Sequence, residues 1–222
     1  ENKKPDKKSD HYVGDYYVLY AKKAAEDPGL ETDAQQMLVK WEHGDTKVRA
    51  LWKRMNSWAL KGFAQTYKRF GITFDKEYFE SVLYEAGKEV ALEGLDKGIF
   101  VKDEKGSIVA PFESHNLPNK VLLRGDGTSV YMTQDLYLAQ KRYEDYHFDR
   151  STYVVASEQQ LHFQQLFKIM ELLHRPYASK LYHLSYGMVH LPTGRMKSRE
   201  GTVIDADDIM DEMKALAETE IR

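Results

Sequence analysis

The chain has 222 residues and a net charge of −3, and its composition is 42% apolar and 30% charged. This balance suits a folded protein, and no run approaches the roughly 18 apolar residues that a membrane span requires, so we expect no membrane partner. The absence of cysteine excludes disulfides and thiolate metal sites and fits the cytoplasmic location that we expect. Any contact with nucleic acid must come from local basic patches, because the whole chain is slightly acidic.

The first part of the chain, to about residue 97, is predicted to be mainly helical. Helices are expected over residues 11–23, 31–41, 46–70 and 79–97. The third has an apolar stripe at every third or fourth residue, with Asp45 as its N-cap and Gly71 as its end. Its cations lie largely off that stripe, at Lys47, Lys53, Arg54, Lys61, Lys68 and Arg69. This basic face is either solvated, the more usual case, or approaches nucleic-acid phosphates.

From about residue 99 the pattern changes to alternating strands and helices. Two short apolar runs, 99–102 and 107–110, flank Asp103-Glu104-Lys105-Gly106, which predicts a hairpin. Further strands are expected at 120–124, 152–156 (of buried type), 180–186 and 188–191. Helices are expected at 135–146, at 160–173 and from Asp205 onward, the last with a core face of Met213, Leu216 and Ala217. The alternation predicts an α/β fold in which helices pack on a parallel sheet.

Common catalytic motifs are absent from the sequence. The eight histidines are scattered, with no two at metal-ligand spacing, so we expect no metal site. There is also no glycine-rich phosphate loop of the common types and no nucleophile elbow. Three segments nevertheless have the character of a binding site.

The first of these segments runs from Gly125 to Asp135. Tyr131 and Asp135 are four residues apart across a predicted strand-to-helix junction. A carboxylate that faces a cleft at such a junction can bind a cationic group. The alternative is that Asp135 simply caps the helix.

The second and third segments flank predicted strands. Residues 153–162 lead from a strand into a polar cluster and a helix, and ligands of open α/β sheets bind beyond the carboxyl ends of strands. An ordinary turn capped by Ser157 would explain the same residues, and His162 alone does not indicate a catalyst. Residues 194–201 carry three cations within five positions, Arg195, Lys197 and Arg199. Their charge suits a triphosphate, although a solvated loop would have the same composition.

Together these segments resemble arginyl-tRNA synthetases, which are class I aminoacyl-tRNA synthetases. Residues 195–199, Arg-Met-Lys-Ser-Arg, are similar to the second class I signature, Lys-Met-Ser-Lys-Ser. Further matching segments are 11–17, 52–74, 123–129 with Tyr131 and Asp135, and 153–163. The resemblance covers nearly the whole chain. It implies the second half of a Rossmann-like nucleotide-binding domain at 117–222, preceded by a mainly helical connective region with the small hairpin at 1–116.

The resemblance also implies an activity and a set of site residues. The activity is ATP-dependent activation of L-arginine to arginyl-adenylate and transfer to tRNA(Arg), with Mg²⁺ accompanying ATP. Arginine would be bound by Tyr131, Asp135, Gln159 and Glu80, with Asp135 facing the guanidinium, which pairs with carboxylates in a bidentate manner. Adenine would lie against the backbone of Gly187, Met188 and Val189. The phosphates would be held by Arg195, Met196, Lys197, Ser198 and Arg199, with Lys197 and Arg199 in the catalytic role.

The sequence departs from the family pattern in three respects. The first class I signature, His-Ile-Gly-His, does not occur, and neither does the helical anticodon-binding domain that normally follows a segment like 205–222. Ser198 occupies the position of the signature lysine, and Arg195 replaces the first lysine. We therefore expect a fragment that cannot activate arginine without the missing parts of the same enzyme. Such a fragment would expose a sheet edge or face that the missing half covers.

Two other interpretations remain open. The chain could be a non-catalytic nucleotide- or tRNA-binding module derived from a synthetase. A purely structural protein is the third possibility, but it would leave the cationic segment and the Tyr131–Asp135 pair unexplained.

Overall fold

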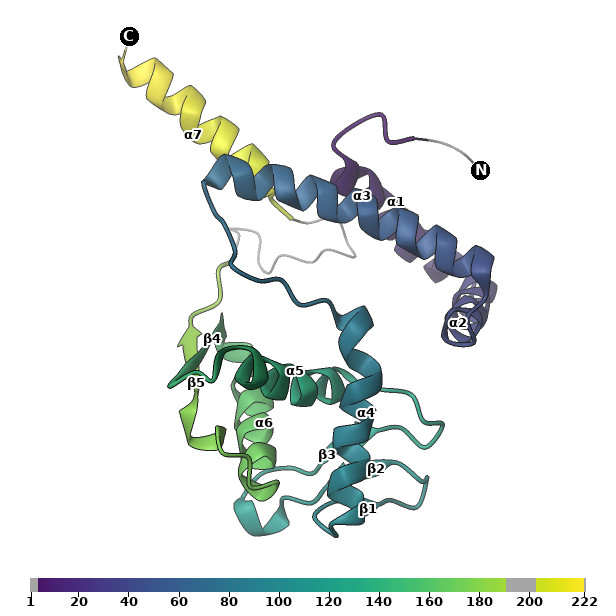
Figure 1. Ribbon diagram of the computed structural model, residues 1–222. Coiled ribbons are helices and arrows are strands. Elements are labelled where there is room, and N and C mark those ends of the chain that lie inside the picture. Colours follow the sequence, from purple (N-terminus) through teal and green to yellow (C-terminus); the bar gives the residue numbers. More distant parts are fainter. Residues whose placement is uncertain (1–3, 191–202, 222) are drawn as a thin grey trace. The chain divides into compact units, whose positions relative to one another are not determined.

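The computed structural model describes residues 4–190 and 203–221, which form two compact units (Figure 1). The helical unit comprises the described residues of Glu1–Asp75 and His190–Arg222, and the sheet unit comprises Lys76–Val189. None of the helices in the described residues is long and apolar enough to cross a membrane. The hairpin before residue 116 and the strand after residue 117 share one sheet, and both belong to the sheet unit.

The helical unit contains the predicted helices, which are α1 (Ser9–Glu26), α2 (Gly29–Glu42), α3 (Thr46–Phe70) and α7 (Ala206–Ile221). The predicted ends of α3 are confirmed. The Asp45 carboxylate accepts hydrogen bonds from the backbone N–H groups of Lys47 (3.0 Å) and Val48 (2.9 Å). Gly71 adopts a left-handed conformation with φ 69° and ends the helix.

Apolar residues of the helical unit are only partly covered. Helix α1 packs on α3, where the rings of Tyr12 and Trp58 meet edge-on at 5.7 Å. The expected core stripe of α3 is half-buried at Leu51 and Met55, but Phe70 is 50% exposed. No hydrophobic side chain among the described residues of this unit is fully buried.

The prediction that α7 has a core face is wrong. Met213, Leu216 and Ala217 are all exposed, because no described element of the helical unit covers that side of the helix. The buried residue of α7 is instead an acid, Asp207, which lies in its first turn.

The sheet unit alternates helices and strands, as predicted. Its helices are α4 (Glu80–Asp96), α5 (Tyr131–Tyr146) and α6 (Gln160–Leu172), with 3-10 turns η1 (Glu113–His115), η2 (Ser157–Gln159) and η3 (Ala178–Lys180). Its strands are β1 (Val101–Lys102), β2 (Ile108–Ala110), β3 (Lys120–Leu123), β4 (Ser151–Ala156) and β5 (Leu181–Tyr186).

These strands form two small sheets. The first is antiparallel, in the order β1-β2-β3, and includes the predicted hairpin. The second is the parallel pair β4-β5, in register from Ser151 opposite Leu181 to Ala156 opposite Tyr186. The strand expected at 188–191 is wrong over its described residues 188–190, which are irregular because β4 ends opposite Tyr186 and offers no pairing partner beyond it.

The hydrophobic core lies in the sheet unit. Helix α6 inserts Phe163 against the parallel pair, with ring centroids 5.0 Å from Tyr153 and 4.5 Å from His183. The expectation that β4 is buried on both faces is wrong, since Val154 is 62% exposed. Within this unit only one face of the parallel pair carries a helix.

Helices α4 and α5 cross with their backbones in close contact (Figure 1). A Cβ atom added at Gly87 of α4 would lie 2.2 Å from the carbonyl oxygen of Thr133 in α5. Only a residue without a side chain therefore fits at this crossing.

We predict that Gly87→Ala destabilises the sheet unit by about 1–3 kcal/mol, because the added methyl group must displace a buried backbone carbonyl. Hydrogen exchange of peptides from α4 and α5 in increasing denaturant would measure this loss. Gly14→Ala is the control, since nothing lies within 4 Å of a Cβ at Gly14 in α1. That change should be neutral or slightly stabilising. Equal protection of α4 in wild type and Gly87→Ala would contradict the predicted contact.

Candidate functional site

The start of α5 is fixed by a buried threonine. Thr133 is fully buried, and its hydroxyl accepts a hydrogen bond from the Val130 N–H at 2.9 Å and donates one to the carbonyl of Leu122 in β3. One hydroxyl therefore caps the helix and joins it to the strand that precedes it. Tyr131 and Asp135 lie two residues before and after Thr133, on the same side of the first turns of α5.

Asp135 does not cap the helix. Helix α5 begins at Tyr131, four residues earlier than expected, so the capping interpretation of Asp135 is wrong. Its Oδ2 lies 2.7 Å from Nε2 of His162 in α6. The Asp135 side chain is 32% exposed and Oδ1 has no hydrogen-bond partner among the described residues, whereas the Tyr131 side chain is highly exposed. Both can therefore contact a ligand.

The next candidates lie at the carboxyl ends of the two parallel strands, β4 and β5. Gln159 is the last residue of η2, directly after β4, and is exposed. Gly187, Met188 and Val189 follow β5 and are exposed as well. Because β4 and β5 run in parallel and end opposite each other, these residues share one edge of the sheet. His162 lies in the first turn of α6 and thereby connects Asp135 to this edge.

Glu80 is not joined to this group among the described residues, and a second set of candidates lies outside them. Glu80 is the exposed first residue of α4, and no hydrogen bond or ion pair links it to Tyr131 or Asp135 in the described structure. The candidates for phosphate binding lie outside the described residues; these are Arg195, Met196, Lys197, Ser198 and Arg199.

A buried aromatic side chain lies beside Asp135. Burial raises the pKa of the Tyr153 phenol, and the Asp135 carboxylate raises it further, while Arg142 acts in the opposite direction. The Arg142 guanidinium lies 5.1 Å from the centroid of the Tyr153 ring. Tyr153 therefore stays protonated at neutral pH and provides an uncharged wall next to the carboxylate.

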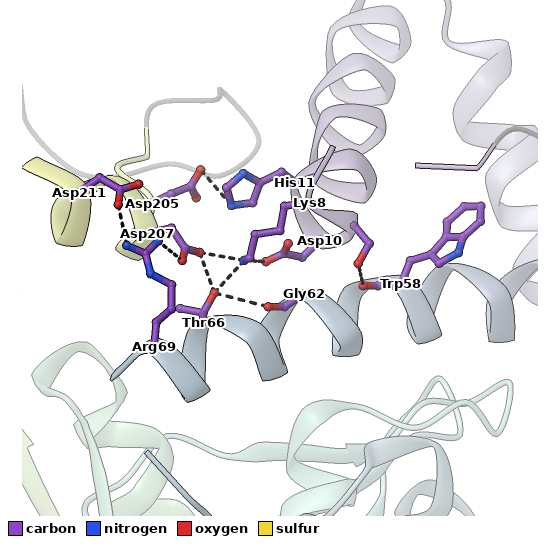
Figure 2. A network of polar contacts seen from close by, with 11 residues as sticks. Lys8, Asp10, His11, Trp58, Gly62, Thr66, Arg69, Asp205, Asp207 and Asp211 are labelled. Carbon is purple, nitrogen blue, oxygen red and sulfur yellow. Dashed lines mark hydrogen bonds and ion pairs between the residues drawn. The ribbon is translucent and has the colours of Figure 1, made fainter. Parts of the chain in front are cut away.

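A polar network anchors the chain just after the cationic segment. Figure 2 shows Asp207 of α7 meeting side chains of α3 and of the residue before α1. Its carboxylate lies 2.8 Å from Lys8 Nζ and 2.8 Å from Arg69 Nη1, and it accepts a hydrogen bond of 2.7 Å from the Thr66 hydroxyl. Arg69 also pairs with Asp211 at 2.7 Å. The start of α7 is therefore held by charges and not by apolar packing.

Sequence reasoning missed three functional features of the site. His162 gave no signal as the partner of Asp135, because the two residues are far apart in the chain. Thr133 could have been noticed as a hydroxyl residue within the first turn of a helix. Asp207 is an acid in a first turn, a common helix-start feature, but its basic partners come from distant elements.

Comparison with known proteins identifies the family. Residues 1–222 match the family described as tRNA synthetases class I (R), catalytic domain. The chain belongs to this family of class I synthetase catalytic domains, as the resemblance predicted. The "R" is arginine in the one-letter code, and the curated relatives agree with it.

The relatives are named arginine–tRNA ligases. The protein from Bacteroides fragilis (strain YCH46) is 50% identical over 228 residues, covering 95% of this chain and 38% of that protein. The protein from Treponema pallidum subsp. pallidum is 51% identical over 215 residues, covering 96% of this chain and 36% of that protein. The chain thus spans little more than a third of the length of these relatives.

Solved structures show the same fold. The arginyl-tRNA synthetase of Thermus thermophilus matches with a TM-score of 0.59 at 18% identity, over 92% of this chain and 44% of that chain. The Plasmodium falciparum enzyme matches with a TM-score of 0.61 at 19% identity, over 72% of this chain and 28% of that chain. The predicted fold class is confirmed by this similarity and by the mixed strands and helices of the sheet unit.

The Asp207 network predicts a pH-dependent stability. The hydrogen bonds and ion pairs that the Asp207 carboxylate receives, chiefly the hydrogen bond from Lys8, lower the pKa of Asp207 from 3.8 to about 2. A lowered folded-state pKa means that the stabilisation is complete above pH 3.8 and is lost as the pH falls toward 2. Asp207→Asn should remove at most roughly 2 kcal/mol at neutral pH and flatten the stability profile between these values.

Urea unfolding, followed by the fluorescence of the tryptophans, measures this effect, because Trp41, Trp52 and Trp58 all lie in the helical unit. Asp208→Asn is the matched control, since Asp208 is exposed in the same helical turn. Identical pH profiles for wild type and Asp207→Asn would show that the network does not stabilise the unit.

Proposed function

We propose that this chain is part of an enzyme that joins L-arginine to tRNA(Arg) using ATP. The observation that carries the proposal is the Asp135 carboxylate, which is partly exposed, is oriented by His162, and is connected through it to the carboxyl edge of the parallel pair. A carboxylate in this position can pair with the guanidinium of arginine, and a lysine ammonium could not reproduce that bidentate geometry.

Each remaining candidate has a role in this proposal. Tyr131, one helical turn before Asp135, covers the arginine side chain, and Gln159 and Glu80 complete the contacts to its polar groups. The backbone of residues 187–189 binds adenine. Residues 195–199 bind the phosphates, where Lys197 and Arg199 stabilise the charge that develops in the reaction. Support comes from the family membership and from the shared sheet edge of Gln159 and residues 187–189.

The proposed reaction has two steps. An oxygen of the arginine carboxylate attacks the α-phosphorus of ATP, a new phosphorus–oxygen bond forms, and the bond to the bridging oxygen breaks as pyrophosphate leaves. A hydroxyl of the terminal adenosine of tRNA then attacks the carbonyl carbon, and AMP leaves. The protein acts by positioning the reactants and by stabilising phosphate charge, so no covalent enzyme intermediate is required.

Magnesium enters this proposal together with ATP. The described residues contain no group of three or more histidine or acidic side chains that could hold a metal ion. Mg²⁺ commonly binds through substrate phosphates and water with few protein ligands. A cytoplasmic location is part of the same proposal, because tRNA charging supplies protein synthesis.

Asp135→Asn in the full-length protein tests the arginine site. The substitution removes a charge-assisted hydrogen bond, which typically contributes about 1.5–3 kcal/mol, so kcat/KM for arginine should fall by roughly ten- to a hundred-fold. Arginylation of tRNA over a range of arginine concentrations measures it. Glu144→Gln is the matched control, since Glu144 lies on the same helix and contacts Gln140. Unchanged arginine kinetics in Asp135→Asn would remove this residue from the pocket.

Lys197→Ala tests the phosphate-binding segment. Loss of this cation should weaken the handling of ATP, raising its KM or lowering kcat, with little change in discrimination between arginine and lysine. Steady-state arginylation with ATP as the varied substrate measures the first effect, and competition with lysine the second. Lys214→Ala removes an exposed lysine of α7 and serves as the control. Loss of amino-acid discrimination with normal ATP kinetics would contradict the assignment.

A further inference from the structure

The helical unit contains a basic cleft whose lining includes none of the residues assigned to arginine and ATP. It has a volume of about 730 Å³. One wall is formed by Lys4, Pro5, Lys7, Lys8 and Ser9, and the other by Arg54, Trp58, Lys61 and Gln65 of α3. Five of these nine residues are cations and none is acidic.

The α3 wall is a single helical face. Its four residues are spaced by four, three and four positions, which places them in one row along the helix. Arg54 and Lys61 are separated by about 10 Å along the helix axis at 1.5 Å per residue. The basic face of α3 predicted from the sequence therefore includes a part that lines a concave surface.

Some cations of the cleft are already neutralised by the protein. Lys8 pairs with Asp10 at 2.6 Å and with Asp207 at 2.8 Å, and Lys7 pairs with Asp15. These two lysines therefore contribute little net charge to a ligand.

The remaining cations of the cleft have no acidic partner among residues 4–190 and 203–221. None of the three, Lys4, Arg54 and Lys61, forms an ion pair with an acid in the part of the chain that the structure describes. The Arg54 guanidinium lies 5.7 Å from the centroid of the Trp58 ring, and its buried Nε has no hydrogen-bond partner among the described residues. A buried donor without a partner is costly, so the described residues alone do not satisfy this side chain.

We propose that this cleft binds the phosphodiester backbone of RNA, with Arg54 and Lys61 contacting successive parts of the strand. This inference rests on the proposed function, in which tRNA is a substrate. Two cations that lack an acidic partner in the described structure and lie about 10 Å apart along a helix suit an extended polyanion better than a single phosphate group. Trp58 and Gln65 lie on the same face and offer stacking and hydrogen-bonding contacts to bases and riboses.

The test is binding of fluorescein-labelled tRNA(Arg) transcript to the full-length protein, measured by anisotropy over a range of KCl concentrations. The double variant Arg54→Ala/Lys61→Ala should bind more weakly, and the slope of log K against log [KCl] should become shallower by roughly 0.7–0.9 for each lost contact. Arg54→Lys should keep most of the salt dependence, because it keeps the charge.

The matched control is Lys47→Ala/Lys53→Ala, which removes two cations from the same helix outside the lining of the cleft. It should change the slope little. Equal losses in the two double variants would mean that only total charge matters, and this would overturn the proposal. Unchanged binding in Arg54→Ala/Lys61→Ala would overturn it as well. So would a competition experiment in which polyglutamate displaces the labelled RNA as effectively as unlabelled RNA does at the same concentration of negative charge.

A second measurement does not depend on variants that fold. Photo-crosslinking of 4-thiouridine-substituted tRNA to the unaltered full-length protein should label peptides containing residues 4–9 or 54–65. Crosslinks confined to other peptides would overturn the proposal.

The two proposals can also fail separately. If the protein charges tRNA with arginine and Arg54→Ala/Lys61→Ala leaves the KM for tRNA unchanged, only the cleft is refuted. A protein that binds RNA at the cleft but never charges arginine refutes only the proposed function.

Discussion

The buried hydroxyl of Thr133 is the contact on which the geometry of the sheet unit depends. It joins the start of α5 to the end of β3, and Gly87 of α4 lies against the carbonyl oxygen of the same residue. Three elements therefore meet at one residue, and Asp135 lies two positions after it. Because a packed interior transmits small displacements, a change in α4 or β3 reaches the Asp135 carboxylate without touching it.

Charge in the helical unit falls into two groups with different roles. Lys8 and Arg69 are neutralised by Asp207 and its neighbours, so they hold α7 against the rest of the unit. Arg54 and Lys61 have no acidic partner among the described residues and line a cleft instead. The net charge of −3 conceals this division, because a whole-chain sum does not distinguish internal ion pairs from cations available to a ligand.

Features set by nearby residues were predictable from the sequence, and features set by distant ones were not. The cap at Asp45, the end at Gly71 and the β1–β2 hairpin follow from local patterns, and so did the family. The pairing of β2 with β3 and the contact between Asp135 and His162 join residues that no periodicity relates. The predictions of burial in β4 and α7 failed for a related reason. The spacing of apolar residues shows which side chains could be covered, whereas what covers them depends on other parts of the protein.

The residues assigned to ATP lie along the chain between anchors that belong to different units. Residues 187–189 follow β5, whose position is set by its pairing with β4 in the sheet unit. Asp207, beyond the cationic residues 195–199, is fixed to α3 and Lys8 in the helical unit. Under the proposed function, adenine would contact the chain near the first anchor and the phosphates would contact it on the way to the second. Under the proposed function, the residues assigned to adenine therefore depend on strand pairing in the sheet unit, whereas Asp207, further along the chain, depends on ion pairs in the helical unit.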